Sequence, residues 1–205
     1  MKRIILASAS PRRSELLTQI GVAFEVMISG QEEFYQSTTP EGIVKELALM
    51  KAQHIAAEIL AAEPLADIMV IGADTVVVLD NEILGKPENE QDAYAMLSRL
   101  QGRAHQVFTG VALINCDGGR ERQIKNFAVA TTVYVHEMDA AEINSYIQTG
   151  EPLDKAGAYG IQGRFAAYVE SIEGDYYNVV GLPVAEIYQE IKDFERSEQF
   201  PASSL

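Results

Sequence analysis

Two consecutive arginines stand where the start of a helix disfavours them. The stretch LASASPRRSELL (6–17) predicts a strand that turns into a helix over 11–20, with Ser10 at the N-cap. Arg12 and Arg13 then fall in the first turn, where unpaired backbone N–H groups and the helix dipole create a positive potential. Each cation is disfavoured there by roughly 0.3–1 kcal/mol at an exposed site. A bound anion would make this placement favourable.

Phosphate is the anion that best fits such a helix start. Helix N-termini bind phosphate through their backbone N–H groups, and the hydroxyls of Ser8 and Ser10 would add two donors. Guanidinium groups pair with phosphate oxygens through parallel hydrogen bonds, which suits Arg12 and Arg13 to a polyphosphate. The alternative is that both arginines fold back to form salt bridges with acidic residues. The sequence contains no Walker A, GxGxxG or HExxH motif, so such a site belongs to none of those classes.

A carboxylate interrupts an otherwise apolar strand. The run IMVIGADTVVVLD (68–80) is rich in β-branched residues, as is typical of a buried central strand, and Asp74 lies within it. A buried carboxylate is costly unless it is paired, capped or bound to a metal ion. Glu32 and Glu33 follow another expected strand, and with Asp74 they could supply hard oxygen ligands for Mg²⁺ or Mn²⁺. The alternatives are that Asp74 caps a turn after Gly72 and that the glutamates belong to a solvated loop.

Three lysines become candidates for phosphate contacts only in combination. Lys86 comes directly before a predicted helix, in LGKP, and Lys155 lies in the glycine- and alanine-rich loop DKAGAYGIQG. A loop of that composition is typical of a close backbone approach to a ligand. Lys51 is expected in the middle of a helix, where an exposed lysine is the ordinary case. The histidines show no metal-ligand spacing and are expected to be structural or on the surface (His54, His105, His136).

Composition excludes several classes of function. The chain has 205 residues, of which 30 are acidic and 16 basic, for a formal net charge of −14. An acidic surface of this kind repels the phosphates of nucleic acid, so no nucleic-acid partner is expected. Cys116 is the only cysteine, which excludes an intrachain disulfide, and it is expected to be a small apolar residue near a hairpin turn. Without a visible signal peptide or an apolar run of membrane-spanning length, the expected location is cytoplasmic.

The pattern of apolar residues and capping residues predicts a mixed α/β sheet with flanking helices. Helices bounded by caps, prolines or glycines are expected over 39–60, 88–102, 139–150 and 183–194. Thr39 and Pro40 mark the first of these starts, and Asp139 with Glu142 has the pattern of a capping box. Apolar runs predict strands over 68–80, 105–116 and 127–138, and a pair of strands over 166–181 around Glu173 and Gly174. Turns are expected at Asp80–Asn81 and at DGG (117–119). One domain is expected over 1–195, followed by a frayed tail over 196–205.

Three stretches together resemble the Maf family of nucleoside triphosphate pyrophosphatases. They are LASASPRRSELL, IGADTVVVLDNEILGKP, and DKAGAYGIQG followed by GDYYNVVGLP, in the family's order, and the resemblance runs from about residue 3 to about residue 194. It implies an elongated mixed β-sheet of the inosine-triphosphatase type, with two lobes around a cleft. It also implies an enzyme, a hydrolase of phosphoanhydrides, that converts a nucleoside triphosphate to the monophosphate and pyrophosphate with a divalent metal cation. A homodimer is the implied assembly.

The resemblance assigns roles residue by residue. Asp74, in the GAD motif, matches the family's proton acceptor, and Glu33 together with Asp74 matches its metal ligands, with Glu32 as a neighbouring candidate. The family's substrate-binding positions match Ser8, Ser10, Arg12, Arg13, Lys51, Thr75, Lys86, Lys155 and Gln162. One departure is Phe165, which stands where the family commonly has a glycine.

The same resemblance favours pyrimidine nucleotides. The branch of the family that acts on dTTP and UTP carries residues that match Arg12, Thr75 and Gln162, whereas the branch that acts on 7-methyl-GTP has a tryptophan at the position of Arg12. One glutamine amide can pair with both the N3–H and the adjacent carbonyl of uracil or thymine, and cytosine presents the wrong pattern. The alternatives are a pyrophosphatase for other non-canonical or modified nucleotides, and a nucleotide-binding regulatory protein linked to cell division.

Overall fold

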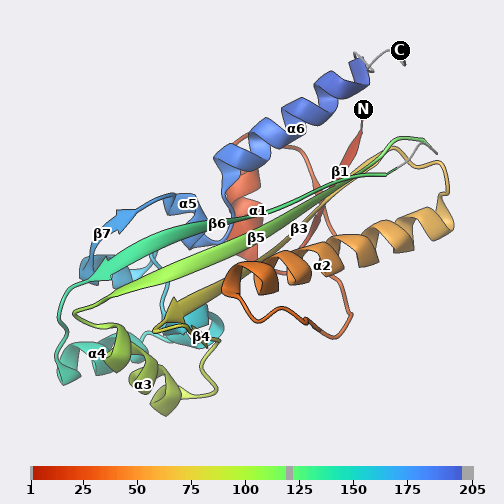
Figure 1. Ribbon diagram of the computed structural model, residues 1–205. Helices are drawn as coiled ribbons and strands as arrows, with labels where there is room; N and C mark the ends of the chain where they lie inside the picture. Colours follow the sequence, from red (N-terminus) through yellow and green to blue (C-terminus); the bar gives the residue numbers. More distant parts are fainter. Residues whose placement is uncertain (1, 119–121, 200–205) are drawn as a thin grey trace.

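A long mixed sheet organises the molecule (Figure 1). The computed structural model describes residues 2–118 and 122–199. The sheet has seven strands in the order β2-β1-β3-β5-β6-β7, with β4 paired to β3. β1 is parallel to β2 and β3, and the remaining pairs are antiparallel. The strands are β1 (Arg3–Ala7), β2 (Glu25–Val26), β3 (Ile68–Leu79), β4 (Glu82–Leu84), β5 (Ala104–Cys116), β6 (Gln123–Val135) and β7 (Val169–Glu173).

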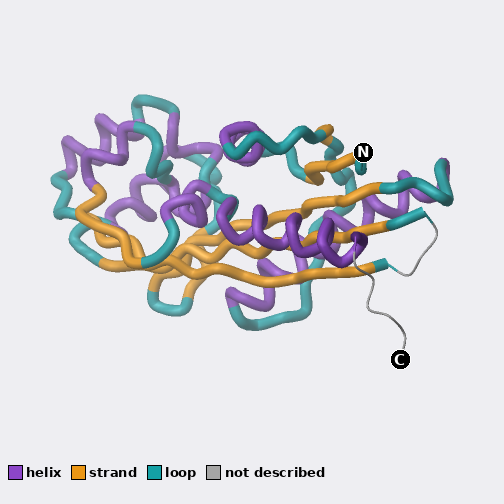
Figure 2. The backbone as a smooth tube through the Cα atoms, turned by 90° about the horizontal axis from the view of Figure 1, so that it is seen from above, coloured by secondary structure: helices purple, strands orange, loops and turns teal. Residues whose placement is uncertain are grey.

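Helices cover both faces of this sheet and gather at one end of it (Figures 1 and 2). α2 (Pro40–Ala62) lies on one face, and α1 (Pro11–Gln19) and α6 (Val184–Gln199) lie on the other. α3 (Glu90–Leu100) and α4 (Ala140–Ile147) pack at the far end. The shorter helical elements are α5 (Tyr176–Val180) and the 3₁₀ turns η1 (Glu151–Asp154), η2 (Ala156–Ala158) and η3 (Arg164–Tyr168).

The alternation of side chains along the strands builds a core on each face. Val70 of β3 packs among buried residues that include Ala52 and Ile55 of α2. The next residue, Ile71, packs in the larger cluster that contains Leu17 of α1 and Ile187 of α6. Successive residues of a strand point to opposite faces, so a nearly continuous apolar run is what a strand covered on both sides requires. Cys116 is buried near the end of β5, as predicted.

Two glycines bring α2 unusually close to the sheet. A Cβ atom at Gly72 of β3 would lie 2.2 Å from the carbonyl oxygen of Ala48, and one at Gly110 of β5 would lie 2.2 Å from that of Val44. The helix backbone therefore rests directly on the strand backbones. This close approach fixes how far the next turn of α2, which carries Lys51, stands from the middle of β3.

The helix starts follow the predicted capping residues, with one exception. The Thr39 side chain accepts a hydrogen bond from the N–H of Gly42 at the start of α2, and Asp139 and Glu142 form a complete capping box at α4. Ser10 holds the N-cap position of α1, but its side chain makes no capping hydrogen bond to the described residues of the helix. Instead the Ser8 hydroxyl accepts from the Ser10 N–H at 3.2 Å.

The prediction of two strands over 166–181 is wrong in its second half. β7 occupies Val169–Glu173, whereas Tyr176–Val180 is the short helix α5. Its aromatic and β-branched residues favour a strand, but the Asp175 side chain accepts a hydrogen bond from the Tyr177 N–H and starts a helix. Gly181, with φ of 124°, ends it. The capping contact and burial against the sheet outweigh the local strand propensity.

Other boundaries shift by a few residues. β6 begins at Gln123 rather than 127, and the turn predicted at 117–119 extends beyond the described residues. α6 continues to Gln199, so the helix extends into the segment predicted as a frayed tail, and 200–205 lie outside the described residues. In the described part of the chain, no helix combines the length and the apolar character needed to cross a membrane.

Candidate active site

One cleft of about 770 Å³ gathers the chemistry-bearing residues predicted from the sequence. Its volume lies in the range of about 300–1,000 Å³ that is typical of small-molecule sites. It is bordered by the β1–α1 turn, the middle of β3, α2, and the segment that runs from η1 to Gly163. Its lining includes Ser8, Ser10, Arg12, Arg13, Glu33, Lys51, Asp74, Thr75, Lys86, Lys155 and Gln162. Glu32 is exposed on the same loop as Glu33 and does not line the cleft.

Asp74 lies inside β3 and meets a cation from α2. Its register partner across the ladder is Gly110, so it does not cap a turn after Gly72. The Lys51 ammonium donates to the Asp74 carboxylate at 2.6 Å and lies 2.8 Å from the Glu33 carboxylate. Asp74 is 15% exposed and Glu33 is 55% exposed. A positive group therefore bridges two carboxylates that arrive from different parts of the chain.

The same two carboxylates define what a metal ion would find here. Among the side chains that the structure describes, no group of three or more acidic, histidine or cysteine residues gathers as a metal site. Mg²⁺ in nucleotide enzymes is commonly held by one or two carboxylates together with substrate phosphates and water. Glu33 and Asp74 are hard oxygen donors, and the cationic Lys51 between them shows that this position favours positive charge. The residues present therefore fit a divalent cation whose remaining ligands come from substrate phosphates and water.

Arg13 is held entirely by neutral acceptors. Its guanidinium donates to the carbonyls of Gly181 and Ala73 at 2.8 and 3.0 Å, and to the hydroxyls of Ser8 and Thr75 at 3.1 and 3.0 Å. These contacts join α1 to the residue that follows β1, to β3 and to the end of α5. Burial lowers the pKa of Arg13 below its ordinary value, opposed by the nearby charge of Asp74. Arg13 therefore brings a positive charge to the cleft while four of its five N–H donors stay committed to the protein.

A chain of threonine hydroxyls continues from Arg13 through the sheet. The Thr109 hydroxyl of β5 donates to the carbonyl of Asn178 at 2.9 Å and contacts the Thr75 hydroxyl at 2.9 Å. A hydroxyl has one proton, so Thr75 must donate to Thr109, and its oxygen accepts from Arg13. The buried Asn178 amide donates to Thr131 of β6 at 2.9 Å. This polar network seats α5 on the sheet and fixes the direction of every hydrogen bond up to the cleft.

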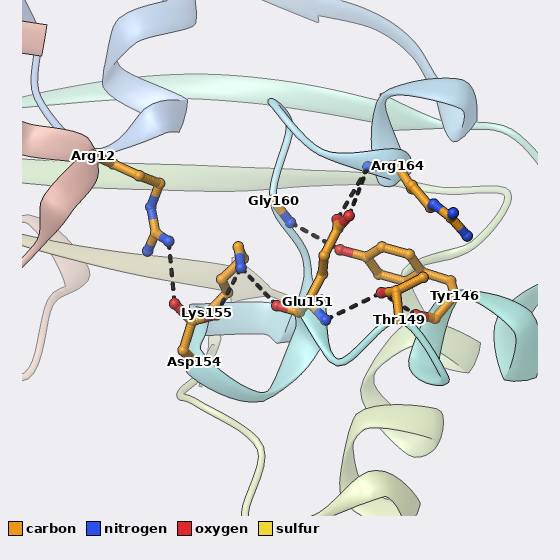
Figure 3. Close-up of polar contacts among 8 residues, drawn as sticks. All are labelled: Arg12, Tyr146, Thr149, Glu151, Asp154, Lys155, Gly160 and Arg164. Atoms are coloured by element: carbon orange, nitrogen blue, oxygen red, sulfur yellow. Dashed lines mark hydrogen bonds and ion pairs between the residues drawn. The ribbon is translucent and has the colours of Figure 1, made fainter. Parts of the chain in front are cut away.

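Arg12 takes a different partner from Arg13. It reaches across the cleft to Asp154 of η1, with Nη1 3.3 Å from the carboxylate (Figure 3). Lys155 donates to the same carboxylate at 2.6 Å and to the Glu151 carbonyl at 2.7 Å. The alternative in which both arginines fold back to acids therefore holds for Arg12 alone.

Two side chains hold the loop that carries Gln162 in place, one from α4 and one from η1 (Figure 3). The Glu151 carboxylate accepts from the Arg164 N–H at 3.0 Å, and the Tyr146 hydroxyl accepts from the Gly160 N–H at 3.2 Å. A Cβ at Gly163 would lie 2.1 Å from the Glu151 carboxylate, so a side chain there would require this carboxylate to move. These contacts hold the Gln162 segment at the edge of the cleft.

Phe165 does not reach the cleft. Its side chain is fully buried and packs on the rings of Tyr146 and Tyr159, with centroid distances of 5.2 and 4.6 Å. The ring supports Tyr159, which does line the cleft. This departure from the family pattern therefore changes the packing behind the Gln162 loop, while the cleft surface is formed by other residues.

Comparisons with known proteins show the family to which the chain belongs. The model of the family described as Maf-like protein matches residues 3–194. The chain belongs to the Maf family. This Maf protein is 48% identical over 194 residues to a protein named dTTP/UTP pyrophosphatase from Lachnoclostridium phytofermentans, covering 95% of this chain and 96% of the relative. Proteins of the same name from Agathobacter rectalis and Bacillus cereus are 49% and 46% identical, over 94% and 95% of this chain and 97% of each relative.

Solved structures support the fold class predicted for this Maf protein. The Staphylococcus aureus Ham1 protein is similar with a TM-score of 0.51 and 14% identity, over 95% of this chain and 100% of that chain. A HAM1 protein from Coxiella burnetii gives 0.50 and 13%, over 94% and 100%. The mixed sheet with flanking helices is therefore shared with Ham1 proteins at low sequence identity.

Sequence reasoning missed several residues that organise the Maf cleft. Thr109 and Asn178 continue the network from Arg13, Glu151 and Asp154 hold the segment around Lys155, and Tyr146 holds the Gln162 loop. Asp154 gave a signal, because an acid directly precedes a lysine expected to bind phosphate. Thr109 gave none, since its pairing with Thr75 depends on the strand register.

Proposed function

We propose that this protein is a nucleoside triphosphate pyrophosphatase that hydrolyses dTTP and UTP to the monophosphate and pyrophosphate. The observation that carries the proposal is the gathering of Arg12, Arg13, Lys51 and Lys155 in one cleft of a chain with net charge −14, beside the carboxylates of Glu33 and Asp74. Cations collected in this way suit a polyphosphate, and the neighbouring carboxylates suit hydrolysis of it. The names of the relatives support the choice of dTTP and UTP.

In this proposal the triphosphate lies along the cations of the cleft. Ser8 and Ser10 stand at the start of α1, where hydroxyl and backbone donors are available to a phosphate. Arg12 and Lys155 bind phosphate oxygens directly, and Lys51 and Lys86 add charge from the sides. Arg13 contributes its charge from a fixed position, because most of its donors are already used. Positioning and charge stabilisation are the main contributions to catalysis in phosphoryl chemistry of this kind.

Asp74 is the proposed proton acceptor for the attacking water. It lies in a rigid strand and is only 15% exposed, which holds its carboxylate in place. Water attacks the α-phosphorus, the bond from that phosphorus to the bridging oxygen breaks, and pyrophosphate leaves with the bond electrons. The proton of the water passes to Asp74 and then to solvent. A divalent cation held by Glu33 and Asp74, when bound, would neutralise phosphate charge and lower the pKa of a coordinated water.

Gln162 is the proposed reader of the base. Its amide can donate to a carbonyl and accept from N3–H of uracil or thymine at the same time. Glu151 and Tyr146 restrain the loop on which it stands, so the amide is presented from a fixed backbone. A restrained amide discriminates against cytosine, whose ring nitrogen accepts where the other two bases donate.

The test is pyrophosphate release from a panel of nucleotides. The purified protein is incubated with dTTP, UTP, CTP, dATP, GTP or 7-methyl-GTP, with Mg²⁺, with Mn²⁺ or with a chelator. We expect metal-dependent release from dTTP and UTP and little from the others. Pyrophosphate release from a nucleotide with another base would support the proposed phosphate site but contradict the proposed role of Gln162. Binding without release from any nucleotide would favour a regulatory nucleotide-binding protein instead.

A further inference from the structure

An acidic side chain stands between two of the cations proposed to bind the triphosphate. The Asp154 carboxylate lies 3.3 Å from Arg12 through one oxygen and 2.6 Å from Lys155 through the other (Figure 3). All three side chains line the same cleft. A carboxylate that bridges two cations in this way satisfies the same donors that a phosphate group would use.

The two cations are less exposed than the anion between them. Lys155 is 16% exposed, its ammonium also donates to the Glu151 carbonyl, and a Cβ at Gly160 would lie 2.6 Å from its Cε. Arg12 is 31% exposed on the first turn of α1. Asp154 is 64% exposed at the end of η1. The carboxylate can therefore turn into water while the Lys155 ammonium keeps the Glu151 carbonyl as a partner.

The carboxylate is charged at neutral pH. Partial burial acts to raise the pKa of Asp154, but the hydrogen bonds and charges of Lys155 and Arg12 outweigh it and hold this pKa below its ordinary value. Asp154 therefore presents a full negative charge to any phosphate that approaches the two cations.

We propose that Asp154 is an internal competing anion that sets how strongly phosphates must bind to occupy the cleft. A ligand reaches Arg12 and Lys155 only by displacing this carboxylate. A polyphosphate can do so because it also contacts the other cations of the cleft, whereas a single phosphate has fewer contacts to offset the displacement. The same competition speeds the departure of pyrophosphate, since the carboxylate returns to the cations as the product leaves. This inference rests on the proposed function insofar as Arg12 and Lys155 are taken to bind phosphate.

The experiment measures anion binding without turnover. Sodium pyrophosphate and sodium orthophosphate are titrated by calorimetry into the wild-type protein and into Asp154→Asn, at low ionic strength with a chelator present. Both anions should bind roughly two- to tenfold more tightly to the variant, because each exposed ion pair that must be broken is worth at most about a factor of five. The affinities of the two anions should increase by a similar factor, since both anions displace the same carboxylate. Asp154→Ala should give the same direction.

Asp80→Asn is the matched control. Asp80 is also an exposed carboxylate paired with an arginine, 2.7 Å from Arg103, and it lies outside the cleft. Its φ of 53° is a conformation that asparagine adopts readily, so the substitution leaves the turn intact. The control makes the same change in net charge and should leave both affinities within error of wild type.

Three results would overturn the inference. The first is anion binding to Asp154→Asn that is unchanged or weaker, which would mean that the carboxylate does not compete or that it assists binding. The second is an equal gain in Asp80→Asn, which would reduce the effect to net charge. The third is an absence of pyrophosphate binding to wild type and variant alike. Because no turnover is measured, a protein that fails to hydrolyse UTP can still show tighter binding in Asp154→Asn, so failure of the proposed function is distinguishable.

Discussion

Asp74 is the single residue whose replacement should separate turnover from binding. In Asp74→Asn the amide keeps the size of the side chain but cannot take a proton at neutral pH. We expect hydrolysis of UTP to fall by about 10²–10⁴-fold, the usual contribution of a positioned general base. Pyrophosphate release with and without substrate saturation is the measurement.

Two controls accompany this substitution. The melting temperature should stay close to that of wild type, because Lys51 keeps Glu33 as a partner at 2.8 Å. Pyrophosphate binding without metal should also survive, since the cations of the cleft are intact. Near-normal hydrolysis by Asp74→Asn would remove the residue from the chemistry.

At the scale of residues, the sequence predicted which residues belong to the cleft better than it predicted which residues they contact. Arg12 and Arg13 stand out because cations are unusual at a helix start, and Asp74 stands out because a carboxylate is unusual in a buried strand. Their partners could not be predicted, since Asp154 and Gly181 lie far along the chain from the arginines they contact. Tertiary packing decides that the two adjacent arginines take different partners, and the local sequence around them does not indicate this.

At the scale of elements, the contact of α2 with the sheet positions Lys51 opposite Asp74. Gly72→Ala should place a Cβ atom 2.2 Å from the Ala48 carbonyl, and the helix must move away to accommodate it. We expect a loss of about 1–3 kcal/mol in the free energy of unfolding, as is usual for overpacking. We also expect reduced hydrolysis, because Lys51 moves with the helix. Urea denaturation and the nucleotide assay measure the two effects.

Gly30→Ala is the comparison for this substitution. A Cβ at Gly30 would meet no atom of residues 2–118 or 122–199 within 4 Å, and Gly30 does not have a positive φ. Its stability and hydrolysis should match those of wild type. Equal behaviour of Gly72→Ala and Gly30→Ala would show that the close approach of α2 has no influence on the cleft.

Elements were predictable where local signals agreed with tertiary packing. The capping box at Asp139 and Glu142 and the proline at the start of α2 marked helix starts that the structure shows. The segment 176–180 was mispredicted because its side chains suit a strand, while Asp175 and the buried Asn178 fix it as a helix. A short helix of this kind depends on hydrogen bonds to other strands, and one sequence does not reveal them.

At the scale of the whole molecule, acid should destabilise the fold through His105. This residue is 3% exposed on β5, its Nε2 lies 2.7 Å from the Tyr159 hydroxyl, and its Nδ1 has no hydrogen-bond partner among the residues described in the structure. Burial lowers the pKa of His105 from 6.5 to about 4. The unfolded chain therefore binds a proton more readily than the folded one, and stability is lost as the pH falls from about 6.5 toward 4.

The size of this effect can be measured against a variant that does not titrate. The contribution of His105 to the free energy of unfolding should decrease by roughly 3 kcal/mol between neutral pH and pH near 4. His105→Gln should be less stable at pH 7 but should lose less stability on acidification. Urea denaturation of both proteins at several pH values tests this, and parallel pH profiles would contradict it.

The contact of the α2 backbone with Gly72 and Gly110 sets the distance between this helix and the sheet. Main-chain atoms set this spacing, and every residue type has the same main chain. Core residues around it, such as Ile55 and Val70, can therefore exchange for other apolar side chains without changing the distance from Lys51 to Asp74. Relatives in which these positions have diverged should keep the same separation between ammonium and carboxylate, as long as both glycines are retained. Apolar substitutions can therefore accumulate in the core while the positions of Lys51 and Asp74 in the cleft stay the same.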